Sequence, residues 1–226
     1  MSLLFVRHGQ ASAGTDDYDA LSQRGFAQSR RLGQWLAATG HQFDEVVIGG
    51  MRRHRQTYES IASVYAEQDK VLPEARVDRG FDEFDHHAVF DGFVRGNADH
   101  PAVIGSRTGG LMALGALIHA ALGAWAEDRI AGVPESWGEF GARVRDAGGR
   151  VVAGRDRRVL VLTSGGVISR LAQHAMGLND RGAIDLNLSL RNSGLCEFHP
   201  RPYGLALGSW NALPHLHDDR ELWTYY

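Results

Sequence analysis

Leu3-Leu4-Phe5-Val6-Arg7-His8-Gly9 is the stretch that decides the fold. Its four apolar residues predict a short buried strand, which runs directly into an arginine, a histidine and a glycine. In open α/β sheets, ligands bind at the carboxyl ends of the strands. Because Gly9 has no Cβ, the backbone can approach a ligand closely there. The arrangement suggests that His8 attacks phosphorus while Arg7 holds the phosphoryl oxygens; the alternative is a plain strand end with an arginine and a histidine on the surface.

Strand-like and helix-like segments alternate along the rest of the chain. The further strand-like runs are Glu45–Ile48, Val159–Leu162, Gly194–Phe198 and Leu205–Trp210. The stretches with helical spacing are Gln23–Ala38, Arg52–Glu67, Val167–Met176 and a segment from Glu135 or Ser136 to about Ala147. This alternation predicts an α/β three-layer sandwich, with a mostly parallel central sheet and helices on both faces.

The length of 226 residues and the hydrophobic fraction of 43% suit one domain that covers residues 1–226. The segment of about 84–134 fits the alternation poorly, since it holds several glycines and an Ala-Leu-rich helical stretch at Leu111–Ala126. We predict that it is a lid-type insertion packed over the edge of the sheet.

Composition narrows the possible partners and the compartment. The net charge of −3 gives no electrostatic case for binding nucleic acid or an anionic membrane. A single cysteine, Cys196, excludes an internal disulfide and fits a reducing cytoplasm, and its apolar surroundings indicate a buried strand thiol. The N-terminus shows no signal-peptide pattern, no apolar stretch is long enough to span a bilayer, and no metal-ligand spacing is present. We therefore expect a cytoplasmic protein without a metal or cofactor.

Two further clusters follow predicted strands. Gly49-Gly50-Met51-Arg52-Arg53-His54-Arg55-Gln56-Thr57 combines glycines with an arginine-rich helix start, which favours an anion, although a solvated basic face is the simpler interpretation of it alone. Thr163-Ser164-Gly165-Gly166 repeats the pattern of strand, small-residue turn and helix. Glu83 lies between aromatic residues, which can raise the pKa of a carboxyl group and suit it to act as a general acid. These two turns and the turn at Arg7-His8-Gly9 should meet at one edge of the sheet.

Taken together, these motifs resemble those of the histidine phosphatase superfamily, which includes the phosphoglycerate mutases, over nearly the whole chain. The matching segments are Val6-Arg7-His8-Gly9-Gln10; Leu21-Ser22-Gln23-Arg24-Gly25 with Gln28 for "L-T-x-x-G-x-x-Q"; Arg53 with Gln56-Thr57 for "S-x-L-x-R-A-x-Q-T"; Glu83; and Glu135-Ser136-Trp137 with Phe140 and Arg143 for "E-S-x-x-x-F-x-x-R".

The resemblance implies a phosphoglycerate-mutase-like fold and covalent catalysis. His8 would become phosphorylated, Arg7 and Arg53 would clamp the phosphoryl group, and Glu83 would protonate the leaving oxygen and then activate water. The residues expected to contact the phosphate are Arg7, Gly9, Gln10, Arg53, Ser164 and Gly165. No metal or cofactor is implied.

The chain departs from the family pattern at two positions. Ser164 stands where the family usually has a second catalytic histidine, in "S-H-G-G", and Gly49 replaces the usual serine before the second arginine. We expect the hydroxyl of Ser164 to face the phosphate as a neutral donor, which would weaken catalysis. His54, His86 and His87 could compensate for the missing imidazole, but we expect each to be a surface or lid side chain.

The leading hypothesis is therefore a phosphomonoesterase that acts on a small phosphorylated metabolite through a phosphohistidine. A weakly active or inactive phosphate-binding protein and a phosphoglycerate-type mutase are the alternatives. The expected partner is a small phosphorylated substrate or free phosphate.

Overall fold

A computed structural model describes residues 2–12, 19–107, 109–153, 157–202 and 204–225. The described strands form one six-stranded sheet in the order β3-β2-β4-β1-β5-β6. Their bounds are β1 Leu3–Arg7, β2 Glu45–Ile48, β3 Ala75–Val77, β4 Val159–Thr163, β5 Leu195–Arg201 and β6 Gly204–Ala212. Strands β3, β2, β4 and β1 run parallel, and β5 and β6 are antiparallel to their neighbours, so the predicted mostly parallel sheet is confirmed.

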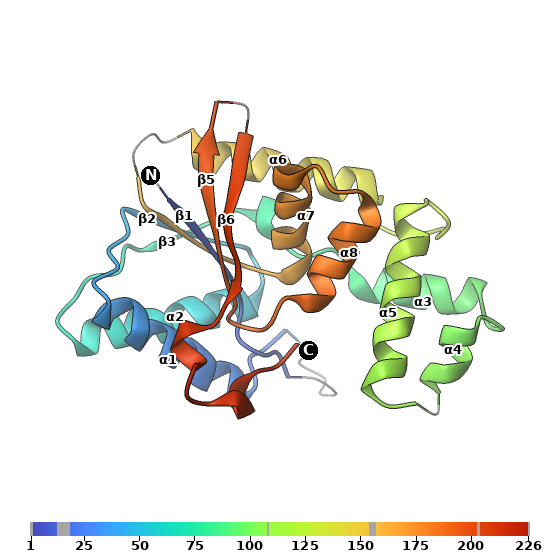
Figure 1. Cartoon of the computed structure of the whole chain (residues 1–226), viewed down its shortest axis with the longest axis horizontal. Coiled ribbons are helices and arrows are strands. Elements are labelled where there is room, and N and C mark those ends of the chain that lie inside the picture. The colour runs from blue at the N-terminus through green and yellow to red at the C-terminus, as the bar shows by residue number, and fades with distance from the viewer. Residues whose placement is uncertain (1, 13–18, 108, 154–156, 203, 226) are drawn as a thin grey trace.

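Eight α-helices are described; α1 and α2 cover one face of the sheet, and α6 and α7 cover the other (Figure 1). Their bounds are α1 Gln23–Ala38, α2 Arg52–Glu67, α3 His86–Gly96, α4 Pro101–Ser106, α5 Leu111–Ala126, α6 Trp137–Val152, α7 Gly165–Met176 and α8 Asp180–Ser189. Compared with the prediction, α6 ends five residues later, and α7 begins directly after Ser164.

Alternate residues of the central strands point to opposite faces, which builds the three layers. On β4, Val159 and Val161 join the core beneath α6 and α7, whereas Leu160 and Leu162 join the core beneath α1 and α2. All four side chains are fully buried, as expected for a parallel strand covered on both sides.

The segment that we expected to be an insertion, 84–134, holds α3, α4 and α5. Figure 1 shows these three helices grouped at one end of the molecule, beyond α8. Buried side chains of α3 and α5, such as Phe93 and Trp125, belong to the same hydrophobic cluster as the α6–α7 face of the sheet. The role of this segment as a lid, and the single domain that would contain it, stay predictions.

The carboxyl ends of the parallel strands bring separate parts of the chain together. Arg7, the last residue of β1, pairs in register with Thr163 of β4, and Ile48 of β2 pairs with Leu162. The turns that follow β1, β2 and β4 therefore meet at one edge, as the sequence predicted.

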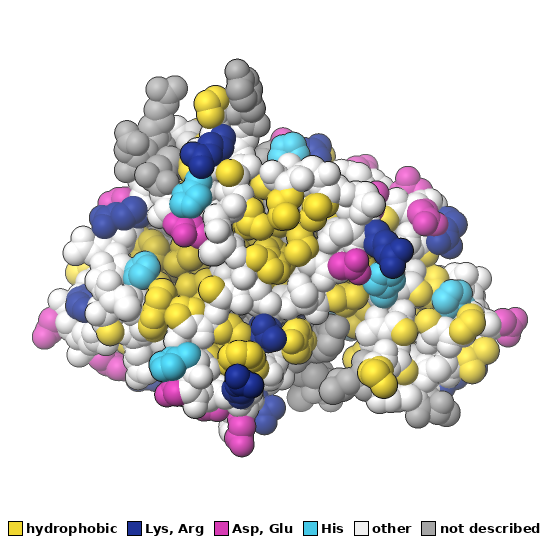
Figure 2. Space-filling model, viewed as in Figure 1, with side chains coloured by type: hydrophobic (Ala, Val, Ile, Leu, Met, Phe, Trp, Pro, Cys, Tyr) yellow, Lys and Arg dark blue, Asp and Glu magenta, His cyan; other side chains and the backbone are white. Residues whose placement is uncertain are grey.

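No helix among the described residues is both long and apolar enough to cross a membrane. On the face shown in Figure 2, side chains of both charge signs are scattered among apolar and neutral ones.

Candidate active site

His8 lies just beyond the end of β1, with 6% of its surface exposed. Its Nδ1 is 2.6 Å from the carbonyl oxygen of Gly9. Because a carbonyl can only accept, Nδ1 carries the proton and Nε2 carries the lone pair. Burial, followed by the charges of Arg53 and Arg7, holds the pKa of His8 well below its ordinary value. The imidazole is therefore neutral at pH 7 and is nucleophilic at Nε2.

Two arginines flank this histidine. Arg7 donates through Nη1 to the carbonyl oxygen of Leu190. Arg53, in the first turn of α2 and 3% exposed, donates through Nη1 to Oδ1 of Asp19 at 2.8 Å. Asp19 also accepts from the backbone amide of Arg52 at 2.8 Å, so it ties the start of α2 to the loop before α1. Asp19 is not among the predicted site residues, because no local motif joins it to an arginine 34 positions away.

Glu83 follows a short 3₁₀ turn, Arg79–Phe81, and extends toward the start of α7. Its Oε2 accepts from the amide of Gly166 at 2.9 Å, and its Oε1 accepts from the amide of Phe84 at 3.3 Å. Burial raises the pKa of Glu83, against the opposing effects of the Gly166 amide and the two arginines. A carboxyl group with a raised pKa can deliver a proton near neutral pH.

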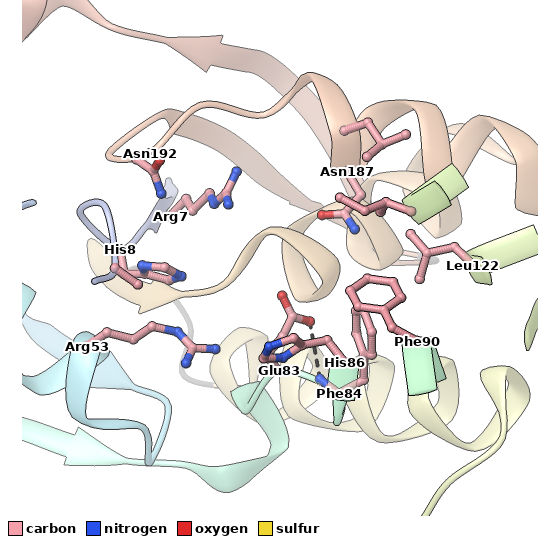
Figure 3. A pocket seen from close by; sticks show the side chains of 13 residues that line it. Arg7, His8, Arg53, Glu83, Phe84, His86, Phe90, Leu122, Asn187 and Asn192 are labelled. Atoms are coloured by element: carbon pink, nitrogen blue, oxygen red, sulfur yellow. Dashed lines mark hydrogen bonds between the residues drawn. The ribbon is translucent and has the colours of Figure 1, made fainter. Parts of the chain in front are cut away.

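These four side chains surround one cavity of about 130 Å³ (Figure 3). The lining residues are Arg7, His8, Ala11, Arg53, Glu83, Phe84, His86, Phe90, Ile118, Leu122, Asn187, Leu188 and Asn192. In Figure 3, Arg7, His8 and Arg53 lie on one side of the cavity, while Phe90 and Leu122 lie on the other, together with Asn187. The structure thus brings together Arg7, His8, Arg53 and Glu83, the four residues for which the sequence predicted catalytic roles.

The remaining residues expected at the phosphate do not line the cavity. The amide of Gly9 donates to Thr57 Oγ1 at 3.2 Å, and a Cβ on Gly9 would lie 2.3 Å from the carbonyl oxygen of Gly25. The missing Cβ of Gly9 therefore allows β1 to approach α1. The amide of Gln10 donates to Gln28 Oε1 at 2.8 Å. Phosphate contacts at Gly9 and Gln10 stay predictions, as does the contact at Gly165.

Ser164 differs from our expectation. It is fully buried, and its Oγ lies 2.7 Å from Nε2 of His54 instead of lining the cavity. The expectation that His54 is a surface or lid side chain is wrong, since its ring is fully buried with its centroid 5.7 Å from that of His8. In the family motif quoted above, an alanine follows the second arginine, where this chain has His54.

Gly49, the other departure from the motif, makes room for this ring. A Cβ at Gly49 would lie 2.3 Å from Nδ1 of His54. The sequence did contain a signal for the burial, because His54 shares a helix face with Thr57 and Ile61, which are both buried. Of the other two histidines considered, His86 lines the cavity and His87 is exposed.

Asn187 and Asn192 line the cavity as well, although no motif in the sequence identifies them. Among the described residues, no group of three or more His, Cys, Asp or Glu side chains is placed to hold a metal ion.

Comparison with known structures supports the fold. The structure of alpha-ribazole phosphatase from Shigella flexneri is 17% identical, with a TM-score of 0.63, over 94% of this chain and 96% of that chain. Phosphoserine phosphatase from Entamoeba histolytica, in complex with phosphoserine, gives 16% identity and a TM-score of 0.61 over 95% and 98% of the two chains. A mycobacterial glucosyl-3-phosphoglycerate phosphatase gives 21% and 0.61 over 93% and 98%.

No curated protein sequence matches the chain. The model of the histidine phosphatase superfamily (branch 1), in contrast, matches residues 3–91 and 113–213, which is most of the chain and includes all four side chains around the cavity. The chain therefore belongs to the histidine phosphatase superfamily.

Proposed function

We propose that the protein is a phosphomonoesterase that works through a phosphohistidine at His8. The observation that carries the proposal is the position of His8 Nε2, freed by the bond from Nδ1 to Gly9, in a cavity that also presents Arg7, Arg53 and Glu83. Two guanidinium groups and one neutral imidazole suit a phosphate monoester dianion.

In the first step, the lone pair of His8 Nε2 attacks phosphorus as the bond from phosphorus to the ester oxygen breaks. Glu83 gives its proton to that oxygen, and the alcohol leaves. Arg7 and Arg53 balance the charge on the phosphoryl oxygens. The proton on Nδ1 stays hydrogen-bonded to Gly9, which orients the ring during the attack.

In the second step, water attacks the same phosphorus and the phosphorus–nitrogen bond breaks. The carboxylate of Glu83 accepts a proton from this water, so that Glu83 returns to its protonated form. Inorganic phosphate leaves, and Nε2 regains its lone pair. A single difficult displacement is thereby divided into two easier ones.

The far wall of the cavity indicates the kind of alcohol. In Figure 3, Phe90, Leu122 and Asn187 lie opposite His8, and the other large apolar lining side chains are Phe84, Ile118 and Leu188. Burial, followed by the charge of His87, lowers the pKa of His86 to about 4, so this neighbour is neutral at pH 7. The arginines among the described lining residues are Arg7 and Arg53, both beside His8. We infer a substrate with one phosphate and an uncharged, partly apolar alcohol, and not a bisphosphate of the kind a mutase uses.

The relatives support the reaction class. The structures with the same fold include phosphatases described as acting on alpha-ribazole phosphate, phosphoserine and glucosyl-3-phosphoglycerate, and one of them holds inorganic phosphate. Because these phosphatases act on different alcohols, the substrate of this chain must be inferred from its own cavity.

The test is turnover of a panel of phosphate monoesters by the wild type and by His8→Ala. We expect the wild type to hydrolyse phosphate esters of uncharged aryl alcohols with a higher kcat/KM than phosphoglycerate. We expect His8→Ala to release no phosphate from any ester. Binding of phosphate without turnover of any ester would instead identify a phosphate-binding protein, and dependence on a bisphosphate would identify a mutase.

A further inference from the structure

Asn192 lines the active-site cavity, but the proposed reaction assigns no task to it. It lies in the turn between α8 and β5, and only 1% of its surface is exposed. Two backbone hydrogen bonds of 3.1 Å fix this turn to the end of β1. The amide of Ser193 donates to the carbonyl oxygen of His8, and the amide of Arg7 donates to that of Gly194. Asn192 is therefore held next to the residues that flank the proposed phosphoryl site.

A chain of hydrogen bonds decides which way the side-chain amide of Asn192 faces, and it begins at the buried side chain of Gln28 on α1. Oε1 of Gln28 accepts from the backbone amide of Gln10 at 2.8 Å, and its Nε2 donates to the carbonyl oxygen of Leu222 at 2.7 Å. Because a backbone amide only donates and a carbonyl only accepts, the orientation of Gln28 is settled. Its Nε2 also donates to Oγ1 of Thr224 at 2.9 Å.

Thr224 passes this direction on to Asn192. Its hydroxyl has one proton, which it donates to Oδ1 of Asn192 at 2.8 Å. The backbone amide of Asn192 in turn donates to the carbonyl oxygen of Thr224 at 2.9 Å. Because Oδ1 is the acceptor in this contact, Nδ2 lies on the other side of the amide group. Figure 3 shows this nitrogen turned toward Arg7 and His8.

Within the part of the chain that the structure describes, no group accepts a hydrogen bond from Nδ2 of Asn192. Buried polar groups in folded proteins nearly always have a partner, and a donor without one lowers stability. A ligand that brings an acceptor into the cavity would supply the missing partner. The oxygens of a phosphoryl group are such acceptors.

We propose that Asn192 donates a hydrogen bond from Nδ2 to a phosphoryl oxygen, and that Thr224 is the positioning residue that keeps this donor facing the cavity. The inference rests on the proposed function, which places the phosphoryl group beside His8. Arg7 and Arg53 bind the same group through charge, whereas Asn192 adds a neutral donor with a fixed direction.

The contact also gives a task to two features that the reaction leaves unused. Gln28 belongs to the sequence motif of the family, and here it orients the hydroxyl of Thr224. Ser164, which stands in place of the second histidine of the family, is turned to His54 and does not line the cavity. Asn192 supplies a donor that Ser164 does not.

The first experiment measures the Kd of inorganic phosphate by calorimetry with the full chain. Asn192→Asp keeps the shape of the side chain and an acceptor for Thr224, but it replaces the donor with a carboxylate oxygen. We expect its Kd to rise at least about tenfold, since a hydrogen bond to a charged ligand is lost. Asn192→Ala, which removes the donor without adding charge, should also raise the Kd about tenfold and serves if aspartate prevents folding.

Thr224→Val and Thr224→Ser form a matched pair for the positioning role. Valine keeps the shape but removes the hydroxyl, so the amide of Asn192 loses the contact that orients it, and the Kd should rise about threefold to tenfold. Serine restores the hydroxyl, so the Kd should return to the wild-type value.

A second readout separates this role from a merely structural one. The ¹⁵N–¹H signals of the Asn192 side chain are assigned by NMR through their loss in Asn192→Asp. They should shift when phosphate saturates the wild type or Thr224→Ser, and by less than half as much in Thr224→Val. A change that only weakened the fold would lower the melting temperature without altering this response.

Unshifted Asn192 signals in the phosphate-saturated wild type, a wild-type Kd in Asn192→Asp, or a wild type that binds no phosphate would overturn the contact. A full wild-type shift in Thr224→Val would overturn the positioning role. Phosphate binding without turnover of any ester would contradict the proposed function alone. Turnover of esters together with unshifted Asn192 signals would contradict this inference alone.

Discussion

At the scale of single residues, the chemistry depends on which nitrogen of His8 carries the proton. The carbonyl oxygen of Gly9 decides this, since its 2.6 Å contact with Nδ1 leaves Nε2 free. The opposite shifts of two neighbours complete the arrangement: the pKa of His8 is lowered and that of Glu83 is raised. The two shifts widen the pH range in which a neutral nucleophile and a protonated acid coexist.

Glu83→Gln should reveal the acid role through its dependence on the leaving group. An alkoxide leaving group needs the proton, whereas a nitrophenolate does not. The kcat for an alkyl phosphate should therefore fall by about 10²–10⁴, and the rate of enzyme phosphorylation by a nitrophenyl ester should fall by less. The alkaline decline in activity, caused by ionisation of Glu83, should also disappear. Steady-state and single-turnover rates across pH check both points, and an equal loss on both esters would contradict the assigned role.

Arg7, His8, Arg53 and Glu83 could be predicted from the sequence because strand ends and local motifs carry them. The pairing of His54 with Ser164 could not, because it joins positions 110 apart and depends on the space left at Gly49. Asp19 escaped prediction for the same reason: its contact with Arg53 exists only after α2 has packed beside the loop.

At the scale of elements, the start of α7 places the acid. Position 166 requires a glycine, because a Cβ there would lie 2.2 Å from Oε1 of Glu83. The helices that were predicted carry recognisable spacing or caps, such as the capping box of α6. Those that were missed give weaker signals: α8 begins only three residues after Gly177 ends α7, and β3 has only three residues, of which two are exposed.

Gly166→Ala should therefore damage catalysis. Alanine favours a helix, but its methyl group must displace the carboxyl of Glu83, so kcat should fall by at least the factor seen in Glu83→Gln. The matched control is Gly149→Ala in α6, where nothing lies within 4 Å of the added methyl; it should keep its activity and gain about 0.5–1 kcal/mol of stability. Equal activity in the two variants would argue against this placement of Glu83.

At the scale of the whole molecule, folding buries several histidines in their neutral form. His215 is 4% exposed, its Nε2 lies 2.9 Å from Ser193 Oγ, and burial lowers its pKa from 6.5 to about 3. Between these two pH values the unfolded chain binds a proton that the folded protein does not. The free energy of unfolding must therefore fall as the pH falls below 6.5.

Comparison of the wild type with His215→Gln isolates this contribution. Glutamine keeps a polar partner for Ser193 but does not titrate, so the wild type should lose about 1 kcal/mol more than the variant between pH 6 and pH 5. Urea unfolding at the two pH values provides the measurement. Identical losses in the two proteins would mean that His215 is not buried neutral.

The fold as a whole was predictable because the alternation of strands and helices allows few arrangements. Within 84–134, the helical stretch Leu111–Ala126 was predicted and is α5, whereas α3 and α4 were missed, since their buried residues pack against other parts of the segment and the main core. This segment supplies much of the apolar lining of the cavity, where we propose that the alcohol binds. The part of the chain that would select the alcohol is therefore the part whose structure was predicted least well.

The most direct measurement for the central claim is the trapping of the phosphoenzyme. Glu83→Gln, mixed with a radiolabelled nitrophenyl phosphate and quenched in alkali, should retain label because phosphorylation needs no acid for this ester while hydrolysis lacks its base. We predict that the label maps to His8, survives alkali, is lost in acid and is absent from Glu83→Gln carrying His8→Ala. Label on another residue, or ester turnover that continues in His8→Ala, would contradict covalent catalysis at His8.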